Sequence, residues 1–439
     1  MFIHFAKLTS GCFLLSSLVQ ATVSPGALET ISAAVDANSV AAFWSPLAEA
    51  GGYTWLAYNR NPMSGNDNGH HNVMVVRRGI DNGVISRDCL KASDGQCATF
   101  LDDAGHNTPS LAVDGDGYVH VFAAMHNEAW HYYRSSQPYS PSQMTSHSSE
   151  MPDSSLLITY PVIKSDSSGN LWLIIRGDNG NGVARGGYLY KYTLSSKTWA
   201  RIARFAYDAD TAVYPDDITF DASGNLHIIF EWSKNPASAI RHQGSYLRYS
   251  PTTNTWSVAN GDTVSVPVTR STPQLVFQPL TAGEQYDTIG VNDTAAPAFQ
   301  SAKLALYESS GIVRMQAAYR YKAAVGGVWQ VRRAYATFGD TAGWTREILF
   351  SDTDTSAAID ITHDGTSVRV YYCKIQDSVY VREKVGNAAW TETALAAGKG
   401  VQRLSVSMRA DGTDVTYLVA PKNVNSTTGS LYLQLVGGR

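Results

Sequence analysis

Short runs of alternating apolar and polar residues fill most of the chain, and three stretches carry them in the same order. Each stretch has a run that begins near a proline, a turn of Asp, Ser and Gly, and a second alternating run. The stretches are 105–126, 159–177 and 213–232. Alternation with a period of two predicts strands with one buried face, and a short polar turn between two such runs predicts an antiparallel hairpin.

Weaker copies of the second strand recur at 53–60, 311–321, 366–373 and 413–420. Several copies are followed by a polar turn that ends in tryptophan, at Trp199, Trp256, Trp344 and Trp390. A small four-stranded unit cannot cover its own apolar faces, whereas units packed around a ring can. We therefore predict an all-β fold, a seven-bladed β-propeller in one domain over residues 22–439. Six or eight blades stay open as alternatives, because the first unit is defined mainly by one strand and the fifth has a long lead-in.

The first 21 residues have one lysine, a short apolar run and small residues at Val19 and Ala21. This pattern predicts a signal peptide at 1–21 and therefore a secreted, extracellular protein. The run is too short and polar for a membrane anchor, and no later segment is long and apolar enough to span a bilayer. We therefore expect no membrane partner. In a secreted eukaryotic protein, Asn292 and Asn425 would be glycosylation acceptors.

Charged residues are only 16% of the 439 residues, and the formal net charge is −4. Without a basic field, nucleic acid is not an expected partner. Cysteine use agrees with secretion, because Cys89 and Cys97 flank a polar loop that a local disulfide can close. Cys373 lies in an alternating run and is interpreted as a buried thiol. We expect a monomer by default.

The predicted hairpins bring polar residues to one face of the ring. Within a blade, the first strand and its neighbour run antiparallel, so the start of one and the end of the other lie at the same end. First-strand starts supply His106, Tyr160 and Tyr214, and second-strand ends supply His126, Arg176 and Trp232, with Glu231 nearby. The turns at the opposite end carry Asp, Ser, Gly and Asn, so we expect one functional face.

This set of residues lacks the carboxylate pair of glycoside hydrolysis, a Ser–His–Asp arrangement and a Gly-rich phosphate loop. It provides a fixed cation beside imidazoles and phenols, which lytic elimination from a uronic acid requires. Arg176, bound bidentately to the carboxylate, would offset the charge that develops when the proton on carbon 5 leaves. His106 and His126 would share proton abstraction and donation, with Tyr160 as the alternative proton carrier. No metal, redox or nucleotide cofactor is predicted.

The stretch DDAGHNTPSLAVDGDGYVHVFAAMH (102–126) resembles the BNR-type repeat propellers that include the ulvan lyases. His106 and His126, twenty positions apart, match that group's histidine pair. Tyr160 and Arg176, sixteen apart, match its tyrosine and its carboxylate-neutralising arginine, and Tyr214 matches a second tyrosine of the site.

In size and leader the chain looks most like the secreted fungal L-rhamnose-α-1,4-D-glucuronate lyases. That resemblance implies release of terminal rhamnose from the glucuronate caps of arabinogalactan-type gums such as gum arabic. An ulvan-type endo-lyase is the alternative within the same group. Outside the group, a sialidase-like hydrolase and a sugar-binding propeller without catalysis stay open.

Asn107 and Trp232 join Tyr214 as candidate substrate-binding residues. For Trp232 the plainer interpretation is packing between blades, and the same holds for Trp130. The other histidines are given plainer roles. His120 and His227 are interpreted as packed strand residues, and His70 and His71, which lack metal-ligand spacing, are assigned to a surface loop.

Overall fold

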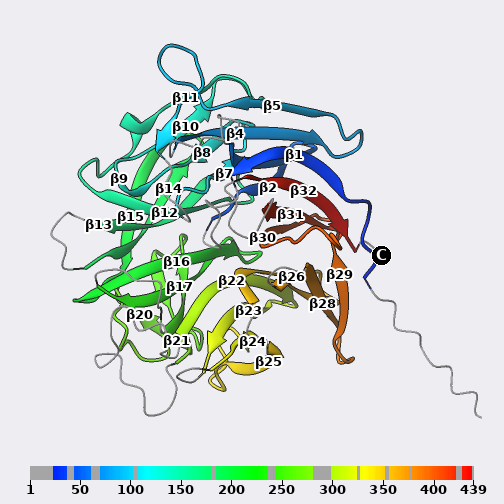
Figure 1. Cartoon of the computed structure of the whole chain (residues 1–439). Coiled ribbons are helices and arrows are strands. Elements are labelled where there is room, and N and C mark those ends of the chain that lie inside the picture. Colours follow the sequence, from blue (N-terminus) through cyan, green and yellow to red (C-terminus); the bar gives the residue numbers. More distant parts are fainter. Residues whose placement is uncertain are drawn as a thin grey trace, which may run out of the picture.

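The computed structural model describes residues 23–36, 44–60, 70–101, 106–178, 184–235, 241, 243–279, 298–323, 327–351, 355–374, 378–421 and 428–437. In these residues, strands β1 to β32 form seven sheets, and the one helical element is a short 3-10 turn, η1 (Ser148–Glu150). The predicted all-β, seven-bladed propeller is therefore confirmed. Figure 1 shows the blades following one another around a ring in sequence order. The predicted signal peptide, Asn292 and Asn425 lie outside the described residues.

Each blade runs from an innermost strand near the axis to an outermost strand at the rim. Blade 1 contains β2 (Leu47–Ala50), β3 (Tyr53–Arg60), β4 (His70–Gly79) and β5 (Ile85–Cys89), with β6 (Phe100–Leu101) paired to β4. Blade 2 contains β7 (Ser110–Val113), β8 (Val119–Phe122), β10 (Tyr132–Ser135) and β11 (Met144–Ser146). Blade 3 contains β12 (Leu157–Ser165), β13 (Leu171–Asp178), β14 (Gly186–Thr193) and β15 (Thr198–Ala206), with β9 (His126–Glu128) added beside β12.

The remaining blades repeat this order. Blade 4 contains β16 (Thr211–Phe220), β17 (Leu226–Lys234), β18 (Gln243–Ser250), β19 (Thr255–Ser257) and β20 (Thr263–Val264), with β21 (Val276–Gln278) paired to β18. Blade 5 contains β22 (Ala298–Ser309), β23 (Ile312–Lys322), β24 (Trp329–Thr337) and β25 (Thr345–Ser351). Blade 6 contains β26 (Thr355–His363), β27 (Ser367–Lys374), β28 (Val379–Val385) and β29 (Thr391–Leu395). Blade 7 contains β30 (Arg403–Met408), β31 (Asp414–Pro421), β32 (Thr428–Val436) and β1 (Glu29–Asp36).

The apolar core lies between the blades. Seven of the buried apolar clusters each draw side chains from two adjacent blades, so every blade is covered on both faces by its neighbours. This arrangement is why the strands read as alternating or nearly continuous apolar runs. The seven innermost strands enclose an axial cavity of about 350 Å³.

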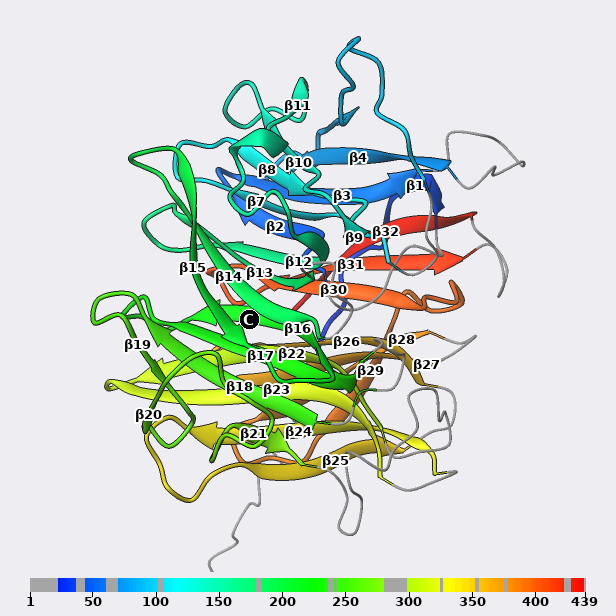
Figure 2. The same cartoon turned by 90° about the vertical axis from the view of Figure 1, so that its left-hand side faces the viewer.

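The ring is closed by the N-terminal part of the chain. Strand β1 pairs antiparallel with β32, with Glu29 opposite Leu433 and Asp36 opposite Thr428. Figure 2 shows β1 in blue running beside β32 in red. The last blade is therefore built from both ends of the described chain.

The repeated Asp/Ser/Gly turns have a defined geometry. In the turn between β7 and β8, the Asp114 carboxylate accepts the backbone N–H groups of Asp116 and Tyr118, and Gly117 has a φ of 89°. Asp166 and Asp221 accept equivalent bonds in blades 3 and 4. A left-handed glycine and an Asp side chain that hydrogen-bonds its own turn explain the recurring sequence signal.

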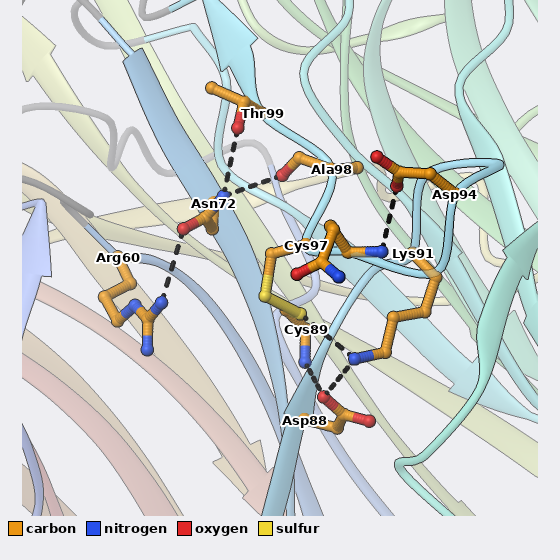
Figure 3. The surroundings of a disulfide bond; sticks show 10 residues. Arg60, Asn72, Asp88, Cys89, Lys91, Asp94, Cys97, Ala98 and Thr99 are labelled. Atoms are coloured by element: carbon orange, nitrogen blue, oxygen red, sulfur yellow. Dashed lines mark hydrogen bonds and ion pairs between the residues drawn. A yellow bond between two sulfur atoms is a disulfide. The ribbon is translucent and has the colours of Figure 1, made fainter.

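The predicted disulfide is present. Cys89, the last residue of β5, is bonded to Cys97, with their Cα atoms 5.5 Å apart. Figure 3 shows the bond next to Asn72, whose side-chain amide donates to the Ala98 carbonyl at 2.8 Å. Cys373 is a buried free thiol in β27, as predicted. Among the described residues, no helix has the length and apolar character needed to cross a membrane.

Candidate functional site

Two histidines on either side of the β7–β8 hairpin stack face to face. His106 lies just before β7 and His126 opens β9, and their ring centroids are 3.9 Å apart with 3° between the planes. The structure thus brings together the pair that hairpin geometry predicted to be close. The route differs, because β9 has left the sheet of blade 2 and pairs with β12 of blade 3, where Thr159 lies opposite His126.

Tyr160 faces this histidine pair from a bulge in β12. Between Thr159 and Val162 the pairing with β13 shifts register, so two residues of β12 stand opposite one of β13. Tyr160 has a φ of 60°, a left-handed conformation that is unfavourable for a bulky residue and concentrates at functional sites. Its ring centroid lies 6.1 Å from that of His106 and 6.3 Å from that of His126.

Arg176 lies beneath the two tyrosines that the sequence placed with it. Its guanidinium carbon is 4.5 Å from the ring centroid of Tyr160 and 5.0 Å from that of Tyr214. The residue is only 1% exposed, and its Nη2 donates to Asn127 Oδ1 at 3.4 Å. Within the described part of the chain, its Nε and Nη1 have no hydrogen-bond partner. A buried cation with unsatisfied donors is costly, and such groups are typical of sites that bind a ligand.

A second guanidinium, that of Arg241, also lies against Tyr214 and forms an ion pair with a carboxylate. Arg241 lies 4.7 Å from the Tyr214 ring centroid, and its Nε donates to Glu231 at 2.6 Å. Burial raises the pKa of the Glu231 carboxyl, and Arg241 opposes that rise. Burial and the neighbouring Glu231 raise the pKa of Asp216 well above its ordinary value. Burial and Glu231 therefore favour the protonated form of Asp216, while Arg241 favours the charged form of Glu231.

The assembled groups have complementary chemistry. Imidazoles can accept or donate a proton near neutral pH, and the phenol of Tyr160 can donate one. The Arg176 guanidinium can hold a carboxylate through two parallel hydrogen bonds. The site therefore combines an anion-binding group with proton carriers close to it.

One predicted substrate-binding residue, Trp232, lies outside the site. Trp232 is fully buried in the cluster between blades 3 and 4, and its Nε1 donates to Ser245 at 3.0 Å. The assignment of Trp232 to the functional face is wrong, because in β17 the residue opposite Tyr214 is Glu231 and Trp232 points to the other side of the sheet. The repeat itself carried this signal, since Arg176 and Glu231 each stand seven residues after their turn glycines, Gly169 and Gly224.

Asn107 is buried and acts in the loop before β7. Its Nδ2 donates to the Leu101 carbonyl at 2.8 Å, and its own carbonyl accepts from Asn59 at 3.1 Å. These bonds anchor the segment that carries His106. Contact with a substrate stays a prediction for the Asn107 Oδ1 atom alone, which is buried without a hydrogen-bond partner in the described part of the chain.

Sequence reasoning missed Asn127, Trp44 and Arg241. Trp44 packs edge-on against Tyr160 with ring centroids 5.5 Å apart and lines the axial cavity. Neither Trp44 nor Arg241 belongs to one of the strong repeats, so no local pattern pointed to them. Asn127 carried one signal, its position next to His126.

The other histidines do not join the site. His120 and His227 are buried strand residues, as interpreted, each bonded to a turn aspartate and a tyrosine. The surface-loop assignment is wrong for His71, which is buried in β4 and packs near Phe100. In the residues that the structure describes, no group of three or more His, Cys, Asp or Glu side chains could hold a metal ion.

Comparison with known proteins places the chain in a family. A model of the BNR repeat-containing family matches residues 53–337. The chain belongs to the BNR repeat-containing family. No curated protein matches the sequence.

Solved structures share the propeller of this BNR repeat protein. The polysaccharide lyase Uly1 aligns with a TM-score of 0.65 at 15% identity, covering 94% of this chain and 100% of that chain. A PL25 ulvan lyase bound to -[GlcA(1-4)Rha3S]- aligns with a TM-score of 0.66 at 15% identity, covering 92% of this chain and 94% of that chain. At these identities the likeness establishes the common fold.

Proposed function

We propose that this BNR repeat protein is a polysaccharide lyase that cleaves the glycosidic bond to carbon 4 of a glucuronate by β-elimination. The observation that carries the proposal is the buried Arg176 guanidinium, with unsatisfied donors, next to a stacked histidine pair. The substrate class is supported by the shared fold of the two lyases, one of which is bound to -[GlcA(1-4)Rha3S]-.

In the proposed mechanism, Arg176 binds the uronate carboxylate and stabilises the charge that develops on it. One imidazole removes the proton on carbon 5. The electron pair of that C–H bond forms the C4–C5 double bond while the C4–O bond breaks. The second imidazole or Tyr160 donates a proton to the departing oxygen. The imidazole rings stack at 3.9 Å, and two positively charged rings so close together would repel each other. The stacking therefore favours a mechanism in which one ring is the base and the proton donor is a different group.

The substrate and the cellular location can be proposed more narrowly. We propose release of terminal L-rhamnose from rhamnosyl-α-1,4-glucuronate caps, as in gum arabic, by a secreted monomer. Its support is the sequence resemblance and the buried Arg176 guanidinium, whose Nε and Nη1 have no hydrogen-bond partner among the described residues. Secretion and the monomeric state stay predictions.

The burial of the two carboxyls near the site argues against the hydrolase alternative. A hydrolase needs one carboxyl group to protonate the leaving oxygen and another to reach the sugar or a water. Asp216 and Glu231 are both fully buried, and Glu231 is occupied by Arg241 and by the backbone N–H of Ser301.

Incubation with gum arabic, ulvan and a rhamnosyl-glucuronate oligosaccharide tests the proposal. A lyase generates the ultraviolet absorbance of the C4–C5 unsaturated uronate, and mass spectrometry identifies the released sugar. Release of sugar without that absorbance would favour a hydrolase. Binding with no product from any of these glycans would favour a lectin.

Substitution of Arg176 should remove activity while leaving the fold intact. Arg176→Ala is expected to lower kcat/KM by about 10²–10³-fold, because the developing charge loses its main stabilising group. Arg176→Lys should recover only part of this loss, since an ammonium cannot make the bidentate contact. Arg201→Ala, at a solvent-exposed arginine, is the matched control. Full activity in Arg176→Ala would refute the role assigned to the residue.

A further inference from the structure

Asn127 is the middle residue of β9 and lies in a bulge of that strand. In the pairing of β9 with β12, Ile158 lies opposite Glu128 and Thr159 opposite His126, so Asn127 is the extra residue of a bulge. Its φ of 58° places it in the left-handed region, which asparagine tolerates better than most residues. A bulge redirects a side chain, and this one redirects Asn127 towards β13.

Thr159 holds the Asn127 side chain in one orientation. The backbone N–H of Asn127 donates to Thr159 Oγ1 at 2.9 Å, and that hydroxyl donates back to Asn127 Oδ1 at 3.3 Å. Asn127 Oδ1 also accepts from Arg176 Nη2 at 3.4 Å. The guanidinium of Arg176 can only donate, so the amide cannot turn its NH₂ group towards Arg176 without setting donor against donor.

Strand pairing aligns Thr159 with His126 and with Arg176. Thr159 is opposite His126 on one side and opposite Arg176 on the other. His126 on β9 and Arg176 on β13 are thus connected through Thr159 and Asn127. Thr159 and Arg176 are buried and Asn127 is half-buried, so these bonds are partly shielded from competing water.

The bond to Asn127 leaves the guanidinium ready for a carboxylate. A guanidinium has two edges that can each present a pair of parallel N–H groups, and each edge uses one of the two Nη2 hydrogens. Asn127 occupies one Nη2 hydrogen. The other edge keeps both of its donors, in agreement with the unsatisfied Nε and Nη1 atoms.

We propose that Asn127, supported by Thr159, is the positioning residue that orients Arg176 and so determines where an acidic sugar places its carboxylate. The inference rests on the proposed function of the site. It assigns to Asn127 the discrimination between a uronate and its uncharged ester, in addition to local packing.

The test compares binding of D-glucuronate with binding of its methyl ester by calorimetry, for the wild-type protein, Asn127→Ala and Thr159→Val. The wild type should prefer the acid, and each variant should lose about tenfold of that preference, because the guanidinium is no longer held in register. Asn127→Asp should abolish the preference, since its carboxylate would itself pair with Arg176. Glu128→Ala, at an exposed residue of the same strand, is the matched control and should behave like the wild type.

The outcomes separate the two proposals. If the wild type prefers the acid and Asn127→Ala and Thr159→Val keep that preference within twofold, the positioning role is refuted and the proposed function stands. If the wild type neither discriminates acid from ester nor forms an unsaturated product, the proposed function fails and the inference fails with it. Thermal unfolding of each variant shows whether a loss of preference accompanies loss of the fold, and Thr159→Val serves where Asn127→Ala does not fold.

Discussion

At the scale of single residues, burial decides which side chains of the site carry charge. Arg176 and Arg241 both contact the Tyr214 ring, and Arg241 is ion-paired with Glu231, whereas Arg176 has no carboxylate partner among the described residues. Burial and the negative charge of Glu231 raise the pKa of Asp216, and the charge of Lys303 opposes part of that rise. The site therefore has one guanidinium balanced inside the protein and one, Arg176, whose counter-charge would come from a ligand.

Substitutions of Asp216 and Glu231 should affect stability in different ways. A carboxyl whose pKa is raised by folding contributes stability that is complete below its ordinary pKa and is lost as pH rises towards the folded value. Asp216→Asn removes this dependence, so its free energy of unfolding should fall less between pH 5 and pH 8 than that of the wild type. Glu231→Gln leaves Arg241 buried without its partner and should cost about 3–5 kcal/mol. Denaturant unfolding at pH 5 and pH 8 measures the free energy of unfolding of both variants. A larger loss of this free energy at pH 8 for Asp216→Asn than for Glu231→Gln would contradict the prediction.

At the scale of secondary-structure elements, a repeated side-chain link ties the turn and the strands of a blade together. In blade 2, His120 on β8 bonds Asp114 of the turn at 3.1 Å and Tyr132 of β10 at 2.7 Å. In blade 4, His227 forms the same link with Asp221 and Tyr246. Burial lowers the pKa of both histidines, so each is neutral, with Nε2–H donating to the aspartate and Nδ1 accepting from the tyrosine.

Removal of the tyrosine hydroxyl from either link should destabilise the fold. Tyr132→Phe and Tyr246→Phe each leave a buried histidine Nδ1 without a donor, at a cost of about 1–3 kcal/mol. Tyr53→Phe, at a half-buried ring that packs against Arg77, is the control and should cost less. Thermal and denaturant unfolding compare the three variants. Equal stability of Tyr132→Phe and Tyr53→Phe would show that the link does not stabilise blade 2.

At the scale of the whole molecule, stability depends on closure of the ring. Strand β1 supplies the outer strand of blade 7, and its Ile31 and Val35 fill the cluster between blades 7 and 1. Glu29 also accepts from Arg78 of blade 1 at 2.7 Å. Both ends of the described chain therefore hold the ring that keeps the site's blades in place.

Truncation tests the contribution of this closure. A chain that begins at residue 44 lacks β1, and it should lose at least about 3 kcal/mol from the burial of Ile31 and Val35 alone. It should also aggregate more readily, because the edge of β32 becomes exposed. A chain that begins at residue 23 keeps β1 and is the control. Equal melting temperatures for the two chains would show that β1 is dispensable.

The sequence by itself determined the features that depend on local pattern. Alternation, turn glycines and the matching spacing of the repeats predicted the propeller, and hairpin geometry predicted that His106 lies near His126. The short Cys89–Cys97 loop predicted the disulfide for the same reason, because nearby residues constrain each other directly.

Only the tertiary structure decided what depends on register and on distant parts of the chain. A one-residue offset exchanges the two faces of a strand, so the site received Glu231 while Trp232 went to the core. The transfer of β9 to blade 3, the bulges at Asn127 and Tyr160, and the approach of Trp44 and Arg241 all arise from packing between blades. A local pattern carries no information about such contacts, because they form only when the ring closes.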